Sequence, residues 1–433
     1  MSRQRDFRRP LLLIFIALFA LNVTLFALWL ARPKDNSHAT TSSAVFEEIL
    51  IPVTGFYNFK TDNITSEELK NLKEITDPAD ISPDDTEIYA ISLDNLDYRV
   101  RVVNVDGKYP LDILKEDPEF LTLNQTGVTA LTRRLLTKLA SVGDGAYFAE
   151  KVADFLSSTD LTHTSNEVSF SDSCSNSANM TLCSSPGMYS ALTAIGVDIV
   201  ELTGNHNNDW GATANLETIA KYRDDGILTF GGGTDEEDAA KPLEFKQDGT
   251  EITWIGINNS TSTKGNGQGA SMGHPGANIY DEELTKSQIK AAKDQGKYVI
   301  VDVQFFECYS YPEDGEEMPS CDYPISGQEQ FFRNLIDMGA DMVVGTQAHQ
   351  PQTFELYQDK PIYYGLGNLF FDQIFWPGTE RSLILTHYFN GQKLLQTRIS
   401  ETMYGTDFQP AIISGDAAKN YLTRLADASP KNQ

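Results

Sequence analysis

The sequence predicts an α/β protein in which a layered domain follows a transmembrane helix and a small α/β segment. From about residue 121 onward, short apolar strands alternate with helices that have clear start and stop signals, which is typical of layered α/β domains. Near the N-terminus, an uncharged apolar run is long enough to cross a bilayer. With 40% hydrophobic and 22% charged residues, the 433-residue chain has the balance of a folded protein.

The N-terminal residues predict a membrane anchor. Residues 1–10 form a basic tail with four arginines, and residues 11–31 hold an uncharged apolar run, whereas about 20 apolar residues span a bilayer. A cleaved signal peptide is the alternative, but it has a shorter apolar region and ends in a small-x-small site, which Leu28 to Pro33 lacks. We therefore predict a single-pass signal anchor with a cytoplasmic basic tail and the bulk of the chain extracytoplasmic.

The chain is strongly acidic, with 61 Asp and Glu against 34 Lys and Arg and a formal net charge of -27. This charge makes nucleic acid and anionic membrane surfaces poor partners for the folded part. An anionic partner would therefore have to be held by a local pocket.

Two segments precede the layered domain. Residues 32–44 are rich in Ser and Thr and predict a polar linker. Residues 45–120 predict a small α/β segment, in which Thr65 to Glu68 has the form of a capping box and Asp106-Gly107 is a hairpin turn signal. No catalytic pattern occurs in this segment, and a stalk or adaptor is favoured over a solute receptor.

Residues 121–402 carry the alternating pattern. Ser185-Pro186 starts a helix that Gly196 ends, and a strand follows directly. The final two strands have no helix between them, which indicates a mixed sheet, and residues 403–433 predict a C-terminal tail with a short helix. The main predicted strands are 197–202, 252–257, 298–305, 341–344, 383–389 and 393–399.

Four cysteines suit an extracytoplasmic location, where disulfides persist. Cys174 and Cys183 are nine residues apart and Cys308 and Cys321 thirteen apart, and neither spacing is typical of a zinc site. Four cysteines allow three pairings. The two local disulfides are the simplest, and buried free thiols are the alternative.

Polar motifs follow several predicted strands. In layered α/β proteins, functional residues gather in loops beyond strand ends. A Gly-Asn-His turn can direct an amide oxygen and an imidazole into one cleft, which suits a metal or an anionic ligand, although such a histidine can equally be structural. The motifs are Gly204-Asn205-His206 with Asp209, Gly345 to His349, and Gly365 to Gln373.

In this order, the motifs resemble the capsule-synthesis CapA family, whose domain is that of poly-gamma-glutamate synthesis proteins. The resemblance implies that residues 121–402 form a four-layer metallophosphatase-like sandwich, with two mixed sheets flanked by helices. It also implies a membrane-anchored protein that acts on an anionic extracellular polymer, capsule or poly-gamma-glutamate. Its partners would then include other membrane proteins of an envelope polymer synthesis system.

The sequence departs from the family pattern where the resemblance implies metal ligands. Family members typically have Gly-Asp where this chain has Gly127-Val128, and often histidine where it has Gln304 and Gln347. Asn and Gln carbonyls with few imidazoles do not favour a zinc, iron or manganese pair. If a metal binds, one hard divalent cation such as calcium or magnesium suits the remaining donors.

Two functions remain open at this point. In the first, a scaffold or binding subunit holds the polymer. In the second, an extracellular metal-dependent phosphoesterase or hydrolase uses His206 as general acid or as electrostatic stabiliser of a leaving group. The candidate catalytic residues are His206, Asn205 and Asp209; the candidate substrate-binding residues are Arg133, Gln304, Gln347 and Asn368; the candidate metal ligands are Asn205, His349 and Asp172.

Overall fold

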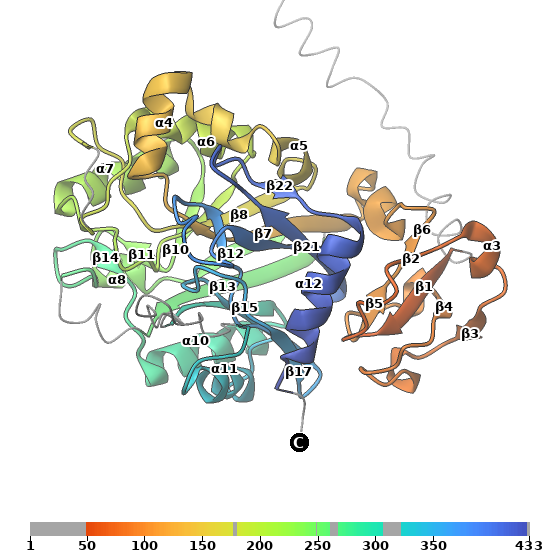
Figure 1. The fold of residues 1–433 in the computed structure, drawn as a ribbon. Helices are drawn as coiled ribbons and strands as arrows, with labels where there is room; N and C mark the ends of the chain where they lie inside the picture. Colours follow the sequence, from red (N-terminus) through yellow and green to blue (C-terminus); the bar gives the residue numbers. More distant parts are fainter. Residues whose placement is uncertain (1–48, 176–179, 248, 260–266, 306–321, 431–433) are drawn as a thin grey trace, which may run out of the picture. The chain divides into compact units, whose positions relative to one another are not determined.

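The computed structural model describes residues 49–175, 180–247, 249–259, 267–305 and 322–430 (Figure 1). From residue 50 onward, the described residues belong to one compact unit. Within these ranges, no helix has both the length and the apolar character that crossing a bilayer requires. The predicted anchor, residues 11–31, and the cysteines at 308 and 321 lie outside the described residues.

One sheet of the main body is mixed. Its strands β7 to β10 run parallel to their neighbours, and β20, β21 and β22 continue the sheet in antiparallel pairs, while β19 pairs with β7. This confirms the predicted mixed α/β organisation. The strands are β7 (Phe120–Thr129), β8 (Leu161–Asn166), β9 (Ile199–Glu201), β10 (Leu228–Phe230), β19 (Asn368–Phe370), β20 (Arg381–Asn390), β21 (Lys393–Met403) and β22 (Ala411–Ile412).

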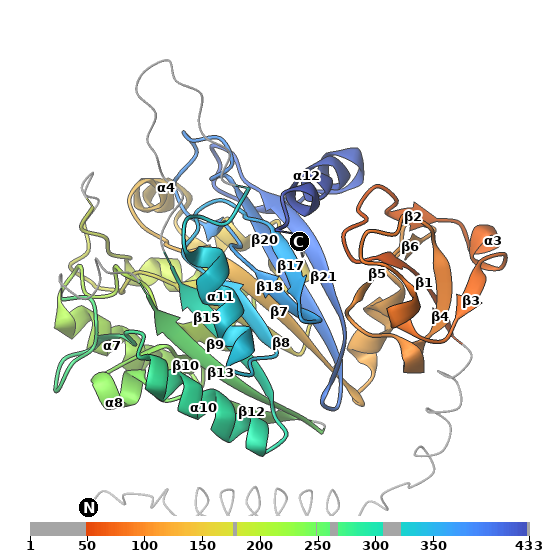
Figure 2. The same cartoon turned by 90° about the horizontal axis from the view of Figure 1, so that it is seen from below.

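The second sheet packs against the first (Figure 2). Its central strands run parallel in the order β13, β15, β16, β18, and β12 and β17 close its edges in antiparallel pairs. The strands are β12 (Leu243–Gln247), β13 (Thr250–Asn258), β15 (Tyr298–Gln304), β16 (Met342–Gly345), β17 (Phe354–Tyr357) and β18 (Lys360–Tyr363), and a small ribbon pairs β11 (Gly232–Gly233) with β14 (Gly276–Ala277).

Helices cover the outer faces of both sheets (Figure 1). Leu135, Leu192 and Ile219 pack on the first sheet, and Ile289 and Phe332 pack on the second. The layers are therefore helix, sheet, sheet, helix. The helices of the main body are α4 (Arg134–Val142), α5 (Ala153–Leu156), α6 (Tyr189–Ala194), α7 (Ala212–Asp224), α8 (Glu236–Ala239), α10 (Glu282–Asp294) and α11 (Gln328–Asp337).

The inner faces of the sheets change from apolar to polar along each strand. Successive side chains of a strand alternate between faces, so every second residue points toward the other sheet. The buried core between the sheets contains the first residue of each inner-face series, and the later members are buried polar groups. The series are Leu123-Gln125, Leu161-His163-Ser165, Ile199-Glu201-Thr203, Ile300-Asp302-Gln304 and Val344-Thr346. The sandwich thus has an apolar half and a polar half, and the polar half lies at the carboxyl ends of the parallel strands.

The small segment has its own sheet, in the order β3-β4-β1-β5. The predicted capping box is present, since Thr65 Oγ1 accepts from Glu68 N and the Glu68 side chain accepts from Thr65 N. The predicted turn at Asp106-Gly107 also forms, and both residues have positive φ. The elements are β1 (Leu50–Gly55), β2 (Asn63–Ile64), α3 (Ser66–Leu69), β3 (Lys73–Ile75), β4 (Tyr89–Ser92), β5 (Val100–Val102) and β6 (Asn104–Val105).

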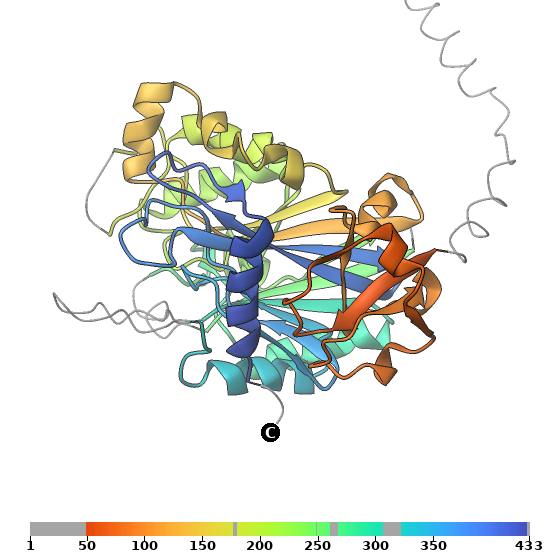
Figure 3. The same ribbon diagram turned by 45° about the vertical axis from the view of Figure 1, so that its right-hand side comes forward.

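The small segment and the C-terminal helix α12 (Gly415–Asp427) share the core of the sandwich (Figure 3). Phe56 and Phe59 from the segment and Leu422 and Leu425 from α12 belong to the same buried cluster as the inner faces of the sheets. The Tyr57 hydroxyl accepts from Leu356 N at 3.0 Å, which fastens the segment to β17. The residues expected as a C-terminal tail therefore contain a helix with a buried apolar face.

Candidate functional site

Loops from the two sheets meet at the carboxyl ends of their parallel strands. The loop after β9 brings Asn205 and His206, and the second sheet brings Gln304 at the end of β15 and Gln347 after β16. Asn258 Nδ2, at the end of β13, donates to Thr203 O at 2.7 Å and ties the first loop to the second sheet. The motifs that the sequence places at separate strand ends therefore converge, as expected for strands of this kind.

Three side-chain amides form a closed hydrogen-bonded group, which we call the amide cluster: Asn205, Gln304 and Gln347. Gln304 Nε2 donates to Asn205 Oδ1 at 2.9 Å and to Gln347 Oε1. An amide NH2 has two hydrogens, so both are used. The Thr203 hydroxyl lies 3.5 Å from Gln304 Oε1, and Gln304 is completely buried. The carbonyl oxygens of Asn205 and Gln347 thus each accept a hydrogen bond from Gln304.

His206 is held by a carboxylate. Its Nδ1 lies 2.7 Å from Asp209 Oδ2, and because a carboxylate only accepts, Nδ1 carries the proton. Asp209 is in turn fixed by Leu182 N at 2.8 Å and by Gln268 Nε2 at 2.7 Å. Asp209 therefore acts on a ligand through His206, and Nε2 is the ring nitrogen that His206 can present to it.

His349 is oriented in a similar way, by an amide. Its Nδ1 lies 2.7 Å from Asn368 Oδ1. Asn368 Nδ2 donates to Thr379 O at 2.9 Å and to Gln373 Oε1 at 3.2 Å, which leaves the oxygen facing the ring. His349 is buried against Phe371, with 5.1 Å between the ring centroids. Asn368, predicted as a substrate-binding residue, is fully buried and positions His349.

Arg133 is neutralised by a carboxylate of the chain itself. Its Nε donates to Asp372 Oδ1 at 3.0 Å, its terminal nitrogen makes a second contact there, and the guanidinium stacks 4.6 Å from the Phe371 ring centre. Arg134 N donates to the other oxygen of Asp372 at 3.3 Å. Arg133 has a φ of 51°, uncommon for a residue other than glycine. It fastens the start of α4 to the loop after β19.

Asp172 does not join the other predicted metal ligands. It is exposed, and it lines a separate hollow with Tyr189 and Lys221. At the position where the family typically has an acid, Val128 is fully buried in an apolar cluster with Ala130, Val168, Leu182 and Phe371. Neither position supplies a carboxylate to the strand ends.

Few groups at the strand ends are arranged as a metal site. The carbonyl oxygens of Asn205 and Gln347 each accept a hydrogen bond from Gln304, and Asp209 and Asn368 hold the two imidazoles through Nδ1, so that Nε2 is the ring nitrogen that could face a ligand or a metal. In the described part of the chain, no group of three or more His, Cys, Asp or Glu side chains is arranged to hold a metal ion. We therefore assign no step to a metal here.

Buried acids beneath the amide cluster were not found by the sequence analysis. Asp302 accepts from Gln125 Nε2 at 2.9 Å and lies 3.1 Å from His163 Nε2. Glu201 accepts from the Thr203 hydroxyl, and burial together with the charge of Asp302 raises the pKa of Glu201 well above its usual range. One sequence signal could have revealed them. Each acid lies within an apolar strand, in Ile199-Val200-Glu201-Leu202 and in Val301-Asp302-Val303.

The predicted disulfide between Cys174 and Cys183 is confirmed, with a Cα–Cα distance of 5.7 Å. It closes the loop that delivers Leu182 N to Asp209, so it supports the position of His206 indirectly.

The fold and this strand-end site define a two-sheet α/β protein whose motif-bearing loops meet at the carboxyl ends of parallel strands. Residues 122–373, more than half of the chain, match the family described as bacterial capsule synthesis protein PGA_cap. The chain belongs to this family, which confirms the resemblance found in its motifs.

The curated relatives are named for the same process. The capsule biosynthesis protein CapA of Bacillus anthracis is 26% identical over 50% of this chain and 51% of its own length. The PGA biosynthesis protein CapA of Bacillus subtilis (strain 168) is 28% identical over 44% of this chain and 46% of its own length. A probable polyglutamine synthesis accessory protein of Mycobacterium tuberculosis is 28% identical over 42% and 48%. The chain spans about half the length of the curated relatives it matches.

Solved structures are only distantly similar. The NAD nucleotidase of Haemophilus influenzae has a TM-score of 0.34 at 11% identity and covers 72% of this chain and 56% of its own. A protein of Thermus thermophilus has a TM-score of 0.33 at 10% identity, covering 61% and 93%. At these scores the likeness carries no argument about function.

Proposed function

We propose that this chain is a binding subunit in the synthesis, export or anchoring of an anionic envelope polymer, capsule or poly-gamma-glutamate. The family membership and the names of the curated relatives support the process. The uncharged apolar run in residues 11–31 supports a single-pass anchor, with the remaining chain outside the cytoplasm and other membrane proteins of the system as partners. The layer order supports the metallophosphatase-like sandwich that the family resemblance implies.

The amide cluster is the observation that favours binding over metal-dependent catalysis. The oxygens of Asn205 and Gln347 accept from Gln304, and Arg133, the cation predicted to bind substrate, is paired with Asp372. The site therefore offers neutral amides and two oriented imidazoles. Poly-gamma-glutamate repeats an amide and a carboxylate, so a hydrogen-bonding site of this type suits its backbone.

Polymer binding by purified protein tests this proposal. We expect poly-gamma-glutamate of defined length, but not neutral dextran, to bind in titration calorimetry, and His206→Ala to weaken binding about tenfold, the scale of one hydrogen bond to a charged group. His274→Ala is the matched control, because among the described residues the ring of His274 forms a hydrogen bond to the Pro275 carbonyl and to no residue of the strand-end site. Absence of polymer binding, or equal binding by His206→Ala, would contradict the proposal.

The second candidate, an extracellular metal-dependent phosphoesterase, is favoured by one feature. The Asp209–His206 pair has the geometry of a general acid oriented by a carboxylate. A screen with a phosphodiester substrate and added magnesium, calcium or manganese decides between the candidates. Turnover that requires metal and disappears in His206→Ala would replace the binding proposal with the enzymatic one.

A further inference from the structure

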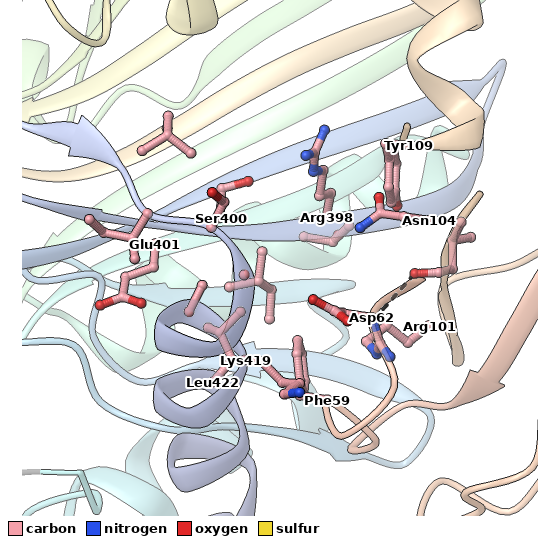
Figure 4. Close-up of a pocket in the computed structure, with 18 residues that line it drawn as sticks. Phe59, Asp62, Arg101, Asn104, Tyr109, Arg398, Ser400, Glu401, Lys419 and Leu422 are labelled. Carbon is pink, nitrogen blue, oxygen red and sulfur yellow. Dashed lines mark hydrogen bonds between the residues drawn. The ribbon is translucent and has the colours of Figure 1, made fainter. Parts of the chain in front are cut away.

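A cavity lies between the small segment, β21 and α12, and shares no residue with the strand-end site. Its volume is about 170 Å³. Figure 4 shows Asp62 and Arg101 close together on one side, Arg398 and Tyr109 across from them, and Lys419 reaching in from α12. Three cations thus line one small cavity in a strongly acidic protein.

Arg101 is held by carbonyl oxygens and a ring, and Asp62, although close, forms no ion pair with it among the described residues. The Arg101 nitrogens donate to the carbonyl oxygens of Asn58 and Thr61 and, at 3.4 Å, to Val102 O. The guanidinium lies 4.8 Å from the centre of the Phe59 ring. No ion pair involves Arg101 in the part of the chain that the structure describes. A guanidinium has five N–H donors, so the carbonyl contacts leave donors over.

Arg101 is half-buried, and this partial burial makes the arrangement less favourable for a cation. It lowers the pKa of Arg101 to about 10, which still leaves the guanidinium charged near neutral pH. Buried charges in proteins are normally paired with an opposite charge. Carbonyl dipoles and an aromatic ring compensate the charge only in part. An anion in the cavity would complete the pairing.

Three cations line the cavity against two acids, Asp62 and Glu401, and most of these charges have partners within the chain. Arg398 stacks 4.5 Å from the ring centre of Tyr109 and reaches Asp112 at 3.4 Å, and Lys419 pairs with Asp416 at 2.7 Å. Of the acids that line the cavity, Glu401 pairs with Arg381, and Asp62 forms no ion pair among the described residues. Asp62 therefore offsets one positive charge at most.

We infer that this cavity binds a carboxylate carried on a short apolar stem. The cations supply the charge-assisted hydrogen bonds that a carboxylate requires. Phe59, Tyr109 and Leu422 supply apolar contact for the stem. At about 170 Å³ the cavity is well below the roughly 300–1,000 Å³ of sites for drug-sized ligands, so it suits one small group. This site goes beyond the proposed function and does not depend on it.

Titration calorimetry with glutarate tests the inference, with its neutral isostere glutaramide as the control ligand. We expect saturable binding of glutarate alone, and at least tenfold weaker binding by Arg101→Gln. Arg99→Gln is the matched control variant, because Arg99 lies on the same segment, pairs with Asp97 and does not line the cavity. Lys419→Gln, on α12, should weaken glutarate binding about threefold. This variant replaces Arg101→Gln in the test if Arg101→Gln does not fold.

Further titrations separate the sources of the carboxylate. Tighter binding of a short γ-glutamyl oligomer than of free glutamate would identify the end of the polymer as the ligand, and the reverse would identify a free metabolite. Glutarate binding that is unchanged in His206→Ala would show that the cavity acts independently of the strand-end site. No saturable binding of glutarate, equal binding of glutaramide, binding of inorganic phosphate in place of glutarate, or unchanged binding by Arg101→Gln would overturn the inference.

Discussion

The strand-end site and the Arg101 cavity treat buried polar groups in opposite ways. At the strand ends, Gln304 satisfies Asn205 and Gln347, and Asp372 neutralises Arg133, so these groups find their partners within the chain and His206 is the one that presents a ring nitrogen to a ligand. In the cavity, Arg101 donates to carbonyl oxygens and stacks on a ring, and Asp62, which lies close by, forms no ion pair with it among the described residues. Resemblance to a family thus indicates where a site lies, whereas the local hydrogen bonds indicate which kind of ligand the site can bind.

The largest effect is expected from Val128→Asp, which restores the acid typical of the family. Val128 is fully buried among apolar side chains, so its replacement places an uncompensated charge there and should cost about 3–5 kcal/mol of unfolding free energy. Urea unfolding measures this loss. Val128→Thr, similar in shape with one hydroxyl, should cost only about 1–2 kcal/mol. Recovery of stability by Val128→Asp on addition of manganese or calcium would show that the remaining donors still form a metal site.

The next effect is expected from loss of the Cys174–Cys183 disulfide. Replacing both cysteines with serine removes a short covalent loop, which should lower the unfolding free energy by about 2–3 kcal/mol. Polymer binding should weaken as well, since this loop delivers Leu182 N to Asp209. Ser175→Ala in the same loop should change neither quantity. Unaltered polymer binding in the double variant would mean that His206 is positioned without this loop.

Glu201→Gln tests the buried acid beneath the amide cluster through pH. The pKa of Glu201 is raised in the folded chain, so its stabilising contribution is complete below the unfolded pKa of about 4.3 and is lost as pH rises through the higher folded pKa. Wild type should therefore lose more stability than Glu201→Gln between about pH 5 and about pH 8 in urea unfolding. Glu217→Gln, on the exposed face of α7, should follow wild type. An equal pH dependence of Glu201→Gln and wild type would contradict the prediction.

The sequence predicts the strand-end motifs well because they are local. A Gly-Asn-His turn directly after an apolar strand can be read from neighbouring residues, and the nine-residue spacing of Cys174 and Cys183 suggests a local disulfide. Partners that lie far apart in the chain could not be read in this way. Gln304 and Asn205, 99 residues apart, meet only because the two sheets pack with a particular register. The hydrogen bonds within the amide cluster therefore depend on the tertiary structure and cannot be read from the sequence.

The Arg101 cavity could not be predicted from the sequence either, because its residues lie far apart in the chain. Arg101 lies in a short strand of the small segment, and Lys419 lies more than 300 residues later in α12. Neither neighbourhood contains a motif. The cavity exists because apolar residues of the segment and of α12 enter one core, which composition and periodicity do not reveal. The small segment, which has no catalytic pattern, therefore contributes side chains to a cavity that α12 and β21 also line.

The smallest effect is expected from Asp62→Asn, which tests how the charge of Asp62 affects the binding of an anion in the Arg101 cavity. Asp62 lines the cavity with Arg101 and acts against a bound anion, so its neutralisation should tighten glutarate binding about two- to fivefold, the scale of a partly screened charge near a surface. The unfolding free energy should change by less than about 0.5 kcal/mol. Asp80→Asn, an exposed acid of the same segment, should leave glutarate binding unchanged. Weaker binding in Asp62→Asn would mean that Asp62 holds the ligand or Arg101 in place, and that the cavity recognises a donor group as well as an anion.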